Sequence, residues 1–262
     1  MGFLEDLAPK KIMLAGDWHG QNYAAKDALL LAKKENVDLI IQLGDFGLWS
    51  GFKGDQYLKY VTLKAAELDI KVLWLDGNHE DFTKLYAKPL DPYTALRHYS
   101  DYLIHLPRNT RWQWSGINFH ALGGGTSLDR SNRTEGINWW PQEAITQAQA
   151  YQAINLGQTD ILLLHDCPEG VTIPTIDRLS SLKYWPEPAL RDAWAHRELL
   201  QEICKTLLPK KIYHGHFHLN YTATASFADD HDTLVTGLAH EALGVKPNTL
   251  ILDLAQLALN IN

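Results

Sequence analysis

The sequence predicts a single α/β domain over residues 1–262, with helices covering a parallel or mixed sheet. Short apolar runs stop abruptly at small or polar residues, helical patterns lie between several of these runs, and no repeat or linker divides the chain. Hydrophobic residues make up 45% and charged residues 21% of the 262, which is typical of a chain with a sizeable core. This balance excludes a disordered chain and a coiled coil.

Six apolar runs are expected to be buried strands, because each is short and stops at a glycine, histidine or aspartate. They are Ile12–Ala15, Leu39–Leu43, Val72–Leu75, Ile117–Leu122, Ile161–Leu164 and Lys211–Tyr213. Three later segments resemble consecutive strands and are expected to give the sheet an antiparallel flank: Asn220–Phe227, Thr233–Leu238 and Thr249–Leu254.

Apolar residues at helical spacing predict helices between these strands. The predicted helices are Asn22–Lys34, Asp55–Leu68, Gln142–Ile154 and Glu187–Leu208. The third begins directly after Pro141, because proline is favoured at the first helical position. Trp74 and Trp194 lie within apolar stripes and are expected in the core.

Charge and cysteine content restrict the function classes. The chain has 24 basic and 31 acidic side chains, a net charge of −7, so no extended nucleic-acid surface is expected. Two cysteines, Cys167 and Cys204, cannot form a disulfide framework. No apolar leader segment and no run of about 18 apolar residues is found, so we expect a cytoplasmic protein without a membrane partner.

Polar clusters follow the predicted strands directly. In open α/β sheets the loops after the strands gather at one edge, where ligands bind, so these clusters are expected to converge. Their chemistry-bearing members are Asp17, His19, Asp45, Asn78, His79, His165, His216 and His218. Oxygen and nitrogen donors without a thiolate suit manganese, iron, zinc or magnesium. Asp17 with His19, and His216 with His218, are two residues apart, so each pair can project to one side.

This set is too large for one metal, which needs about four ligands. Two metals about 3.5–4 Å apart, sharing one carboxylate, would use all of it. The charge of two divalent ions exceeds that of two aspartates, and the surplus matches a hydroxide and a phosphate ester. The residues therefore predict a two-metal phosphoryl hydrolase, with manganese as the preferred ion.

Five motifs in order carry a resemblance to a known family. The chain resembles the calcineurin-like metallophosphoesterases in Gly16-Asp17-Trp18-His19-Gly20, Gly44-Asp45, Gly77-Asn78-His79-Glu80, His165 and Gly215-His216-Phe217-His218. The resemblance implies a four-layer α/β/β/α sandwich of mixed sheets with a dinuclear metal site at the carboxyl ends of the strands. It also implies hydrolysis by a hydroxide held between the two metals.

By the family pattern, each residue of the set has a role. One metal would be held by Asp17, His19, Asp45 and His218. The other would be held by Asp45, Asn78, His165 and His216, with Asp45 bridging. The resemblance makes His79 the catalytic residue that protonates or stabilises the leaving group.

One departure bears on the substrate. In phosphoprotein phosphatases of this family an aspartate that orients the catalytic histidine follows the second motif, but Leu48 stands there in this chain. We therefore expect a small phosphate ester, with a nucleotide phosphodiester as one candidate, before a phosphoprotein. Asp76 is a candidate partner of His79, or of a metal-ligating histidine.

The loop from Gly123 to Arg133 resembles a glycine-rich loop of some bacterial and phage members. Its glycines permit close approach to an anion, and Arg130 and Arg133 are candidate substrate contacts. Ion pairs of these arginines with Asp129 or Glu135 are the alternative.

Several other residues have structural interpretations beside functional ones. His214 is expected to be structural or to support a ligand, His120 to be a hydrogen-bonded core histidine, and Cys167 to be structural. A wall on which a nucleobase stacks, or ordinary packing, are the alternatives for four tryptophans: Trp18, Trp49, Trp139 and Trp140. Two functions compete with the phosphoesterase: a non-catalytic metal-binding scaffold of the same fold, and a nuclease.

Overall fold

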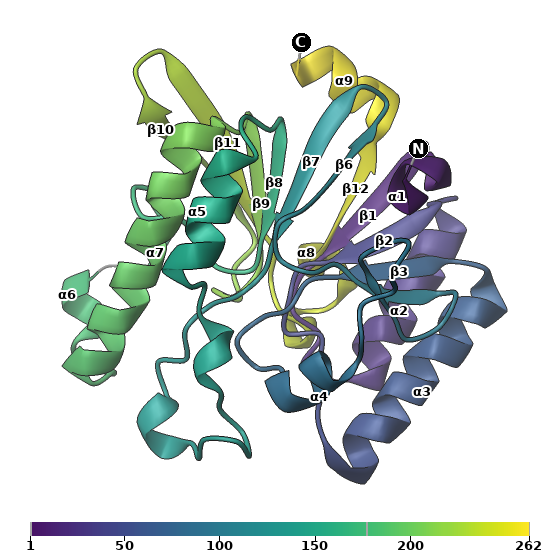
Figure 1. Ribbon diagram of the computed structural model, residues 1–262, viewed down its shortest axis with the longest axis horizontal. Helices are drawn as coiled ribbons and strands as arrows, with labels where there is room; N and C mark the ends of the chain where they lie inside the picture. The colour runs from purple at the N-terminus through teal and green to yellow at the C-terminus, as the bar shows by residue number, and fades with distance from the viewer. Residues whose placement is uncertain (1, 177, 262) are drawn as a thin grey trace.

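Two six-stranded sheets face each other, and helices cover both outer faces (Figure 1). The computed structural model describes residues 2–176 and 178–261. The strand order is β12-β1-β2-β3-β5-β4 in the first sheet and β10-β11-β9-β8-β7-β6 in the second. Helices α2 and α3 cover the first sheet, and α5 and α7 cover the second (Figure 1).

The first sheet consists of β1 (Lys11–Ala15), β2 (Leu39–Gln42), β3 (Lys71–Trp74), β4 (Arg97–His98), β5 (Leu103–His105) and β12 (Thr249–Asp253). The second consists of β6 (Thr110–Trp114), β7 (Ile117–Leu122), β8 (Ile161–Leu164), β9 (Lys211–His214), β10 (Tyr221–Ala228) and β11 (His231–Gly237). In each sheet the inner strands are parallel, and an antiparallel strand lies at either edge. All nine predicted strands are present, whereas β4, β5 and β6 were not predicted.

The sequence led us to expect that the last three predicted strands form one flank of one sheet, and this prediction was wrong. The chain makes β10 and β11 in the second sheet, then crosses through η3 (Glu241–Leu243) and α8 (Val245–Asn248) to the first. There β12 pairs antiparallel with β1, Leu14 opposite Leu250. Each sheet therefore gains its own antiparallel edge.

Three apolar cores separate the four layers. On β1, Ile12 and Leu14 point into the core between the two sheets, and Met13 and Ala15 point toward α2 and α3. The second sheet repeats this alternation on β8, because successive strand residues face opposite sides. The sandwich layers expected from the family resemblance are therefore confirmed.

The remaining helices are α1 (Phe3–Leu7), α2 (Asn22–Lys34), α3 (Gly51–Leu68), α4 (Phe82–Ala87), α5 (Gln147–Asn155), α6 (Arg178–Ser181), α7 (Glu187–Leu207) and α9 (Leu254–Ile261). Two 3-10 turns, η1 (Arg130–Asn132) and η2 (Pro141–Glu143), lie in the segment between β7 and α5. Within the described residues, no helix has both the length and the apolarity needed to cross a bilayer.

The helix expected from Gln142 begins five residues later, at Gln147, with Thr146 and Gln149 forming a capping box. Arg108, which is distant in sequence, donates to the carbonyl oxygens of Gln142, Glu143 and Ala144 over 2.8–2.9 Å and helps to hold this segment in a non-helical conformation. Proline does begin a turn, but η2 lasts only three residues.

Candidate metal centre

The loops after β1, β2, β3, β8 and β9 meet at one edge of the sandwich, between the two sheets (Figure 1). Asp17 and His165 are fully buried there, and Asp45 is 1% exposed. Four residues of the predicted set have left-handed backbone conformations, with φ between 42° and 64°: His19, Asp45, His216 and His218. Non-glycine residues adopt this conformation at a cost, and such positions gather at functional sites.

The first group of ligand atoms surrounds Asp17. His218 Nε2 lies 3.1 Å from Asp17 Oδ2, and His19 Nε2 lies 3.9 Å from the same oxygen. The ligand atoms of these three side chains all lie within 4.8 Å of one another, which is close enough to hold one ion. His19 Nε2 is also 3.3 Å from Asp45 Oδ2, so Asp45 adjoins this group.

A second group lies on the other side of Asp45. His165 Nε2 is 3.4 Å from Asp45 Oδ1 and 3.0 Å from Asn78 Oδ1. Asp45 thus turns one oxygen toward His19 and the other toward His165. A carboxylate in this position can bridge two cations, as two-metal sites require.

His216 lies beside the second group without joining it. Its ring centroid is 5.0 Å from that of His165, and its backbone N–H donates to Asp17 Oδ1 over 3.1 Å. Its Nε2, however, is 4.0 Å from Asp166 Oδ1, a carboxylate that also accepts from His196 Nδ1 over 2.7 Å. Ligation of a metal by His216 therefore stays a prediction.

Hydrogen bonds on the outer ring nitrogens orient two of the histidines. His165 Nδ1 donates to the Leu43 carbonyl over 2.9 Å, and His19 Nδ1 lies 2.8 Å from Glu241 Oε2. Because Nδ1 is engaged in this way, Nε2 is left to face the carboxylate and amide oxygens, and a cation bound among them could take its lone pair in place of a proton. Glu241 was not predicted, although it follows β11 at the same sheet edge as the other clusters.

The fit of a cation can be judged from these converging acceptors. Without an ion they must share protons: burial lowers the pKa of His19, but hydrogen bonds to Asp45 and Glu241 raise it to about 11. Burial likewise lowers the pKa of His165, but the charge of Asp45 raises it to about 10. Asp17 Oδ2 is buried, and His218 Nε2 faces it at 3.1 Å without the geometry of a hydrogen bond. Hard oxygen and imidazole donors around a shared acidic centre fit two divalent cations.

Two glycines make this convergence possible. A Cβ at Gly77 would lie 2.1 Å from Asp45 Oδ1, and a Cβ at Gly215 would lie 2.2 Å from Asp17 Oδ1. Neither carboxylate could keep its place beside a larger residue. The glycines of the third and fifth motifs are thus required by close approach.

His79 lines a cavity of about 360 Å³, which His19 of the metal centre also lines. Burial lowers the pKa of the His79 imidazole, and Asp45 opposes this shift. Trp49 and Trp140 also line the cavity, and Trp49 Nε1 donates to the His79 carbonyl over 2.7 Å. Trp18 does not line it, because its ring packs in the core 5.9 Å from that of Phe46.

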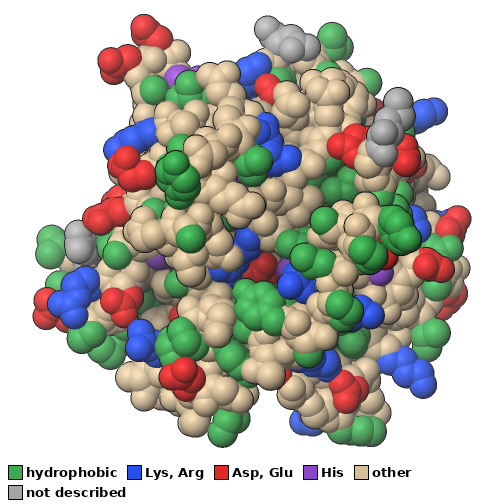
Figure 2. Space-filling view, viewed as in Figure 1, with side chains coloured by type: hydrophobic (Ala, Val, Ile, Leu, Met, Phe, Trp, Pro, Cys, Tyr) green, Lys and Arg blue, Asp and Glu red, His purple; other side chains and the backbone are tan. Residues whose placement is uncertain are grey.

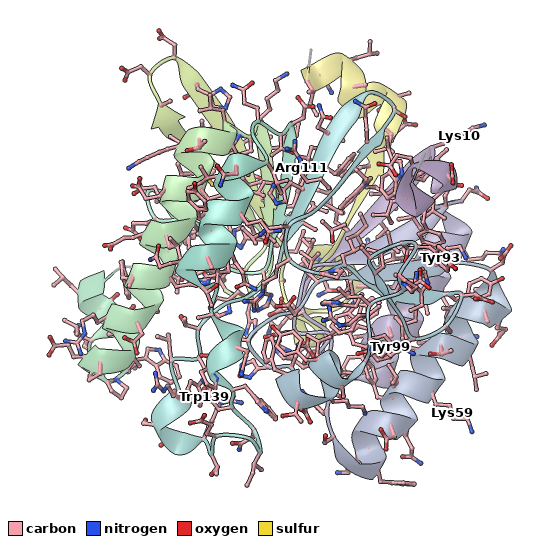
Figure 3. All side chains as sticks on the ribbon, viewed as in Figure 1. Lys10, Lys59, Tyr93, Tyr99, Arg111 and Trp139 are labelled. Atoms are coloured by element: carbon pink, nitrogen blue, oxygen red, sulfur yellow. The ribbon has the colours of Figure 1, made fainter. Side chains whose placement is uncertain are left out.

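The two candidate substrate arginines line different cavities. Arg133 lines the cavity of His79, although Asp129 binds its Nε and Nη2 over 2.7 Å. Arg130 lies over the ring of Trp139 at 4.3 Å and pairs with Asp192 at 3.3 Å. Figure 3 shows Trp139 on the segment between β7 and α5. The ion pair with Asp129 is confirmed for Arg133, whereas that expected for Arg130 is replaced by the pair with Asp192.

Asp76 does not contact His79 or a histidine of the predicted set, so that prediction was wrong. Its Oδ1 faces His105 Nε2 at 3.2 Å, and its Oδ2 accepts from Arg108 Nε over 2.8 Å. Burial raises the pKa of Asp76, but Arg108 and His105 hold it below its usual range. Both carboxylate oxygens are therefore engaged in a structural ion pair.

Glu80, the last residue of the third motif, shapes the loop that follows Asp45. Its buried carboxylate accepts from the backbone N–H groups of Phe46, Gly47 and Leu48 over 2.6–3.1 Å. Burial raises the pKa of Glu80 to about 8. Leu48 is itself buried in the core.

The structural interpretations of three residues are confirmed. His214 is buried and bonds the Tyr221 hydroxyl and the Gly215 carbonyl at 2.7 and 2.9 Å. His120 is buried with Nε2 3.1 Å from Asn109 Oδ1. Burial raises the pKa of the Cys167 thiol to about 12, which disfavours the nucleophilic thiolate.

The surface charge is mixed. Figure 2 shows lysine and arginine side chains scattered among acidic and apolar ones over the visible face. This distribution agrees with the net charge of −7. On this face it differs from the basic stripe with which proteins follow a nucleic-acid backbone.

Similar proteins place the chain in a family. Two solved structures share its fold: a dimetal phosphatase from Danio rerio, 14% identical, with a TM-score of 0.53 over 90% of this chain and 88% of that chain; and the protein TT1561 of Thermus thermophilus, 11% identical, with a TM-score of 0.52 over 88% and 90%. No curated protein sequence matches the chain significantly. The profile of the calcineurin-like phosphoesterases matches residues 10–220. The chain therefore belongs to the calcineurin-like phosphoesterase family.

Proposed function

We propose that this protein is a dinuclear-metal phosphoesterase that hydrolyses a small phosphate ester, with a nucleotide phosphodiester as a candidate substrate. The observation that carries the proposal is the position of Asp45, with one oxygen toward His19 and the other toward His165. Membership of a metallophosphoesterase family supports the same chemistry. Manganese is the preferred ion, with iron, zinc or magnesium as alternatives. A cytoplasmic location stays a prediction from the sequence.

The chain would hold one ion with Asp17, His19, Asp45 and His218, and the other with Asp45, Asn78, His165 and His216. Two divalent ions bound there would supply Lewis acidity toward the phosphoryl oxygens and would lower the pKa of water. Asp45 would contribute to both sites, and hydrogen bonds to the Leu43 carbonyl and the Glu241 carboxylate orient the imidazoles of His165 and His19. His79 and the proposed metal ligand His19 line the same cavity, so His79 can donate a proton to the leaving oxygen of a substrate bound there.

The cavity favours a compact substrate with an apolar group. Its volume of about 360 Å³ lies at the lower end of small-molecule sites. Trp49, 37% exposed, offers an indole surface to an aromatic leaving group, and Arg133, which also lines the cavity, offers its guanidinium to a phosphate oxygen. Substrate contact by Arg130 stays a weaker prediction, because this residue lines a different cavity.

The test is hydrolysis of p-nitrophenyl phosphate and bis(p-nitrophenyl) phosphate by metal-stripped protein to which Mn²⁺ is restored. Asp45→Ala should abolish hydrolysis and lower the bound metal below two ions per chain. Asp27→Ala removes an exposed carboxylate and is the matched control, which should behave as wild type. His79→Ala should retain both metals and lose rate chiefly on substrates with poor leaving groups.

The outcomes separate the competing functions. A wild-type protein that binds two ions yet hydrolyses neither ester supports the non-catalytic scaffold. Cleavage of long polynucleotides in preference to both small esters supports the nuclease. An Asp45→Ala variant with wild-type metal content and rate contradicts the proposed bridging role.

A further inference from the structure

Ser127 and Glu143 form a buried chain of hydrogen bonds that ends on Asn78. Asn78 Nδ2 donates to Ser127 Oγ over 3.0 Å, and Ser127 Oγ donates to Glu143 Oε2 over 2.6 Å. The Ser127 backbone N–H donates to the other oxygen of Glu143 over 2.8 Å. The three residues are 3–5% exposed, so little water competes for these bonds.

The chain is directional, because a hydroxyl has one proton and an amide has two different ends. Ser127 gives its proton to Glu143, so its oxygen can only accept from Asn78. The amide must then turn Nδ2 toward Ser127, which leaves Oδ1 facing His165 Nε2 at 3.0 Å. The reversed amide would set oxygen against oxygen at Ser127 and point N–H donors at the metal centre.

Glu143 is itself anchored through its main chain. Its carbonyl accepts from Gly125 N over 3.0 Å and from Arg108 Nη2 over 2.9 Å. Gly125 belongs to the glycine-rich loop, and a Cβ there would lie 3.2 Å from the His165 ring and 3.4 Å from Asn78 Oδ1. The loop is therefore packed directly behind the second group of ligands.

We infer that Ser127 and Glu143 are positioning residues, which lock the Asn78 amide with its oxygen toward the second metal. The inference rests on the proposed function, because it takes Asn78 as a metal ligand. It assigns the glycine-rich loop a task other than contact with the substrate: the loop presents Ser127 to Asn78.

The neighbouring residue provides a matched control. Thr126 is also buried, but its Oγ1 has no hydrogen-bond partner among the residues that the structure describes. Thr126→Val removes this hydroxyl and keeps the branched shape. Ser127→Ala removes the hydroxyl that Asn78 needs.

The experiment is calorimetric titration of Mn²⁺ into the metal-stripped full chain. Ser127→Ala should weaken the second Mn²⁺ by about 10–100-fold, the usual effect of losing a residue that orients a ligand, and leave the first within about twofold. Thr126→Val should leave both within about twofold of wild type. Glu143→Gln should weaken the second ion as well, because its NH₂ group would face Ser127 Oγ and redirect the hydroxyl proton to Asn78. This variant serves if Ser127→Ala does not fold.

A second background distinguishes orientation from packing. In Asn78→Asp the two carboxylate oxygens are equivalent, so no orientation remains to be locked. Adding Ser127→Ala to Asn78→Asp should therefore not weaken binding of the second ion by more than about twofold. The inference is overturned if Ser127→Ala weakens the second ion equally in both backgrounds, or not at all in a wild-type chain that binds two ions. A wild-type chain that binds no Mn²⁺ overturns the proposed function, and this inference with it.

Discussion

Removing Arg108 should destabilise the protein strongly, because this side chain joins the two halves of the sandwich. Arg108 follows β5 of the first sheet, and its side chain is 5% exposed against Asp76 at 3%. It donates to Asp76 and to the carbonyl oxygens of Gln142, Glu143 and Ala144 in the segment before α5. Arg108→Met would leave a buried carboxylate and three carbonyl oxygens without this partner.

Breaking one side of a buried ion pair costs about 3–5 kcal/mol. For a chain of this size each kcal/mol lowers Tm by about 2–4 °C, so Tm should fall by about 6–20 °C. The free energy of unfolding is measured by urea denaturation of the metal-stripped protein, followed by circular dichroism. Arg130→Met is the control: its pair with Asp192 is exposed, and its loss should cost less than about 1 kcal/mol.

Asp76→Asn combined with Arg108→Met should recover part of the loss, because the charge left unpaired is then removed. Equal costs for Arg108→Met and Arg130→Met would refute the role of the buried pair. So would a double variant whose loss in free energy of unfolding exceeds the sum of the losses of the two single variants.

Three further predictions concern other buried groups. Burial lowers the pKa of His120 from 6.5 to about 3, so the unfolded chain takes up a proton first and the free energy of unfolding should fall as pH drops from about 6.5 toward 3. In His120→Gln the dependence of this free energy on pH should shrink by up to about 1.4 kcal/mol per pH unit. Equal pH dependence of the two proteins in urea denaturation at pH 7, 5 and 4 would contradict the prediction. Gly77→Ala should weaken Mn²⁺ binding by at least about tenfold in calorimetry, because its Cβ would displace Asp45; wild-type affinity would exclude that displacement. Glu80→Ala should lower the free energy of unfolding by about 2–4 kcal/mol, since three buried N–H groups lose their acceptor, and a loss below about 1 kcal/mol would show that water replaces it.

The donors of the centre were predictable because their signals are local. Asp17 and His19 follow β1 directly, as Asn78 and His79 follow β3, and strands end where apolar runs meet glycine or polar residues. Their supporting residues carry no such signal. Glu241 lies 222 residues from the histidine it orients, and Glu143 reaches Asn78 only through Ser127. The prediction for Asp76 failed for the same reason: its partner Arg108 comes from another loop, 32 residues away.

By itself, the sequence determined where nine of the described strands lie, which of their residues are apolar, and which donors stand at their ends. These properties depend on spacings of two to four residues, and short-range sterics and burial impose them. Only the tertiary structure decided how the late strands divide between two sheets, why α5 begins at Gln147, and which oxygen of Asp45 faces which histidine. Each of these depends on how the two sheets face each other, because that packing sets the distances between loops that the chain itself leaves far apart.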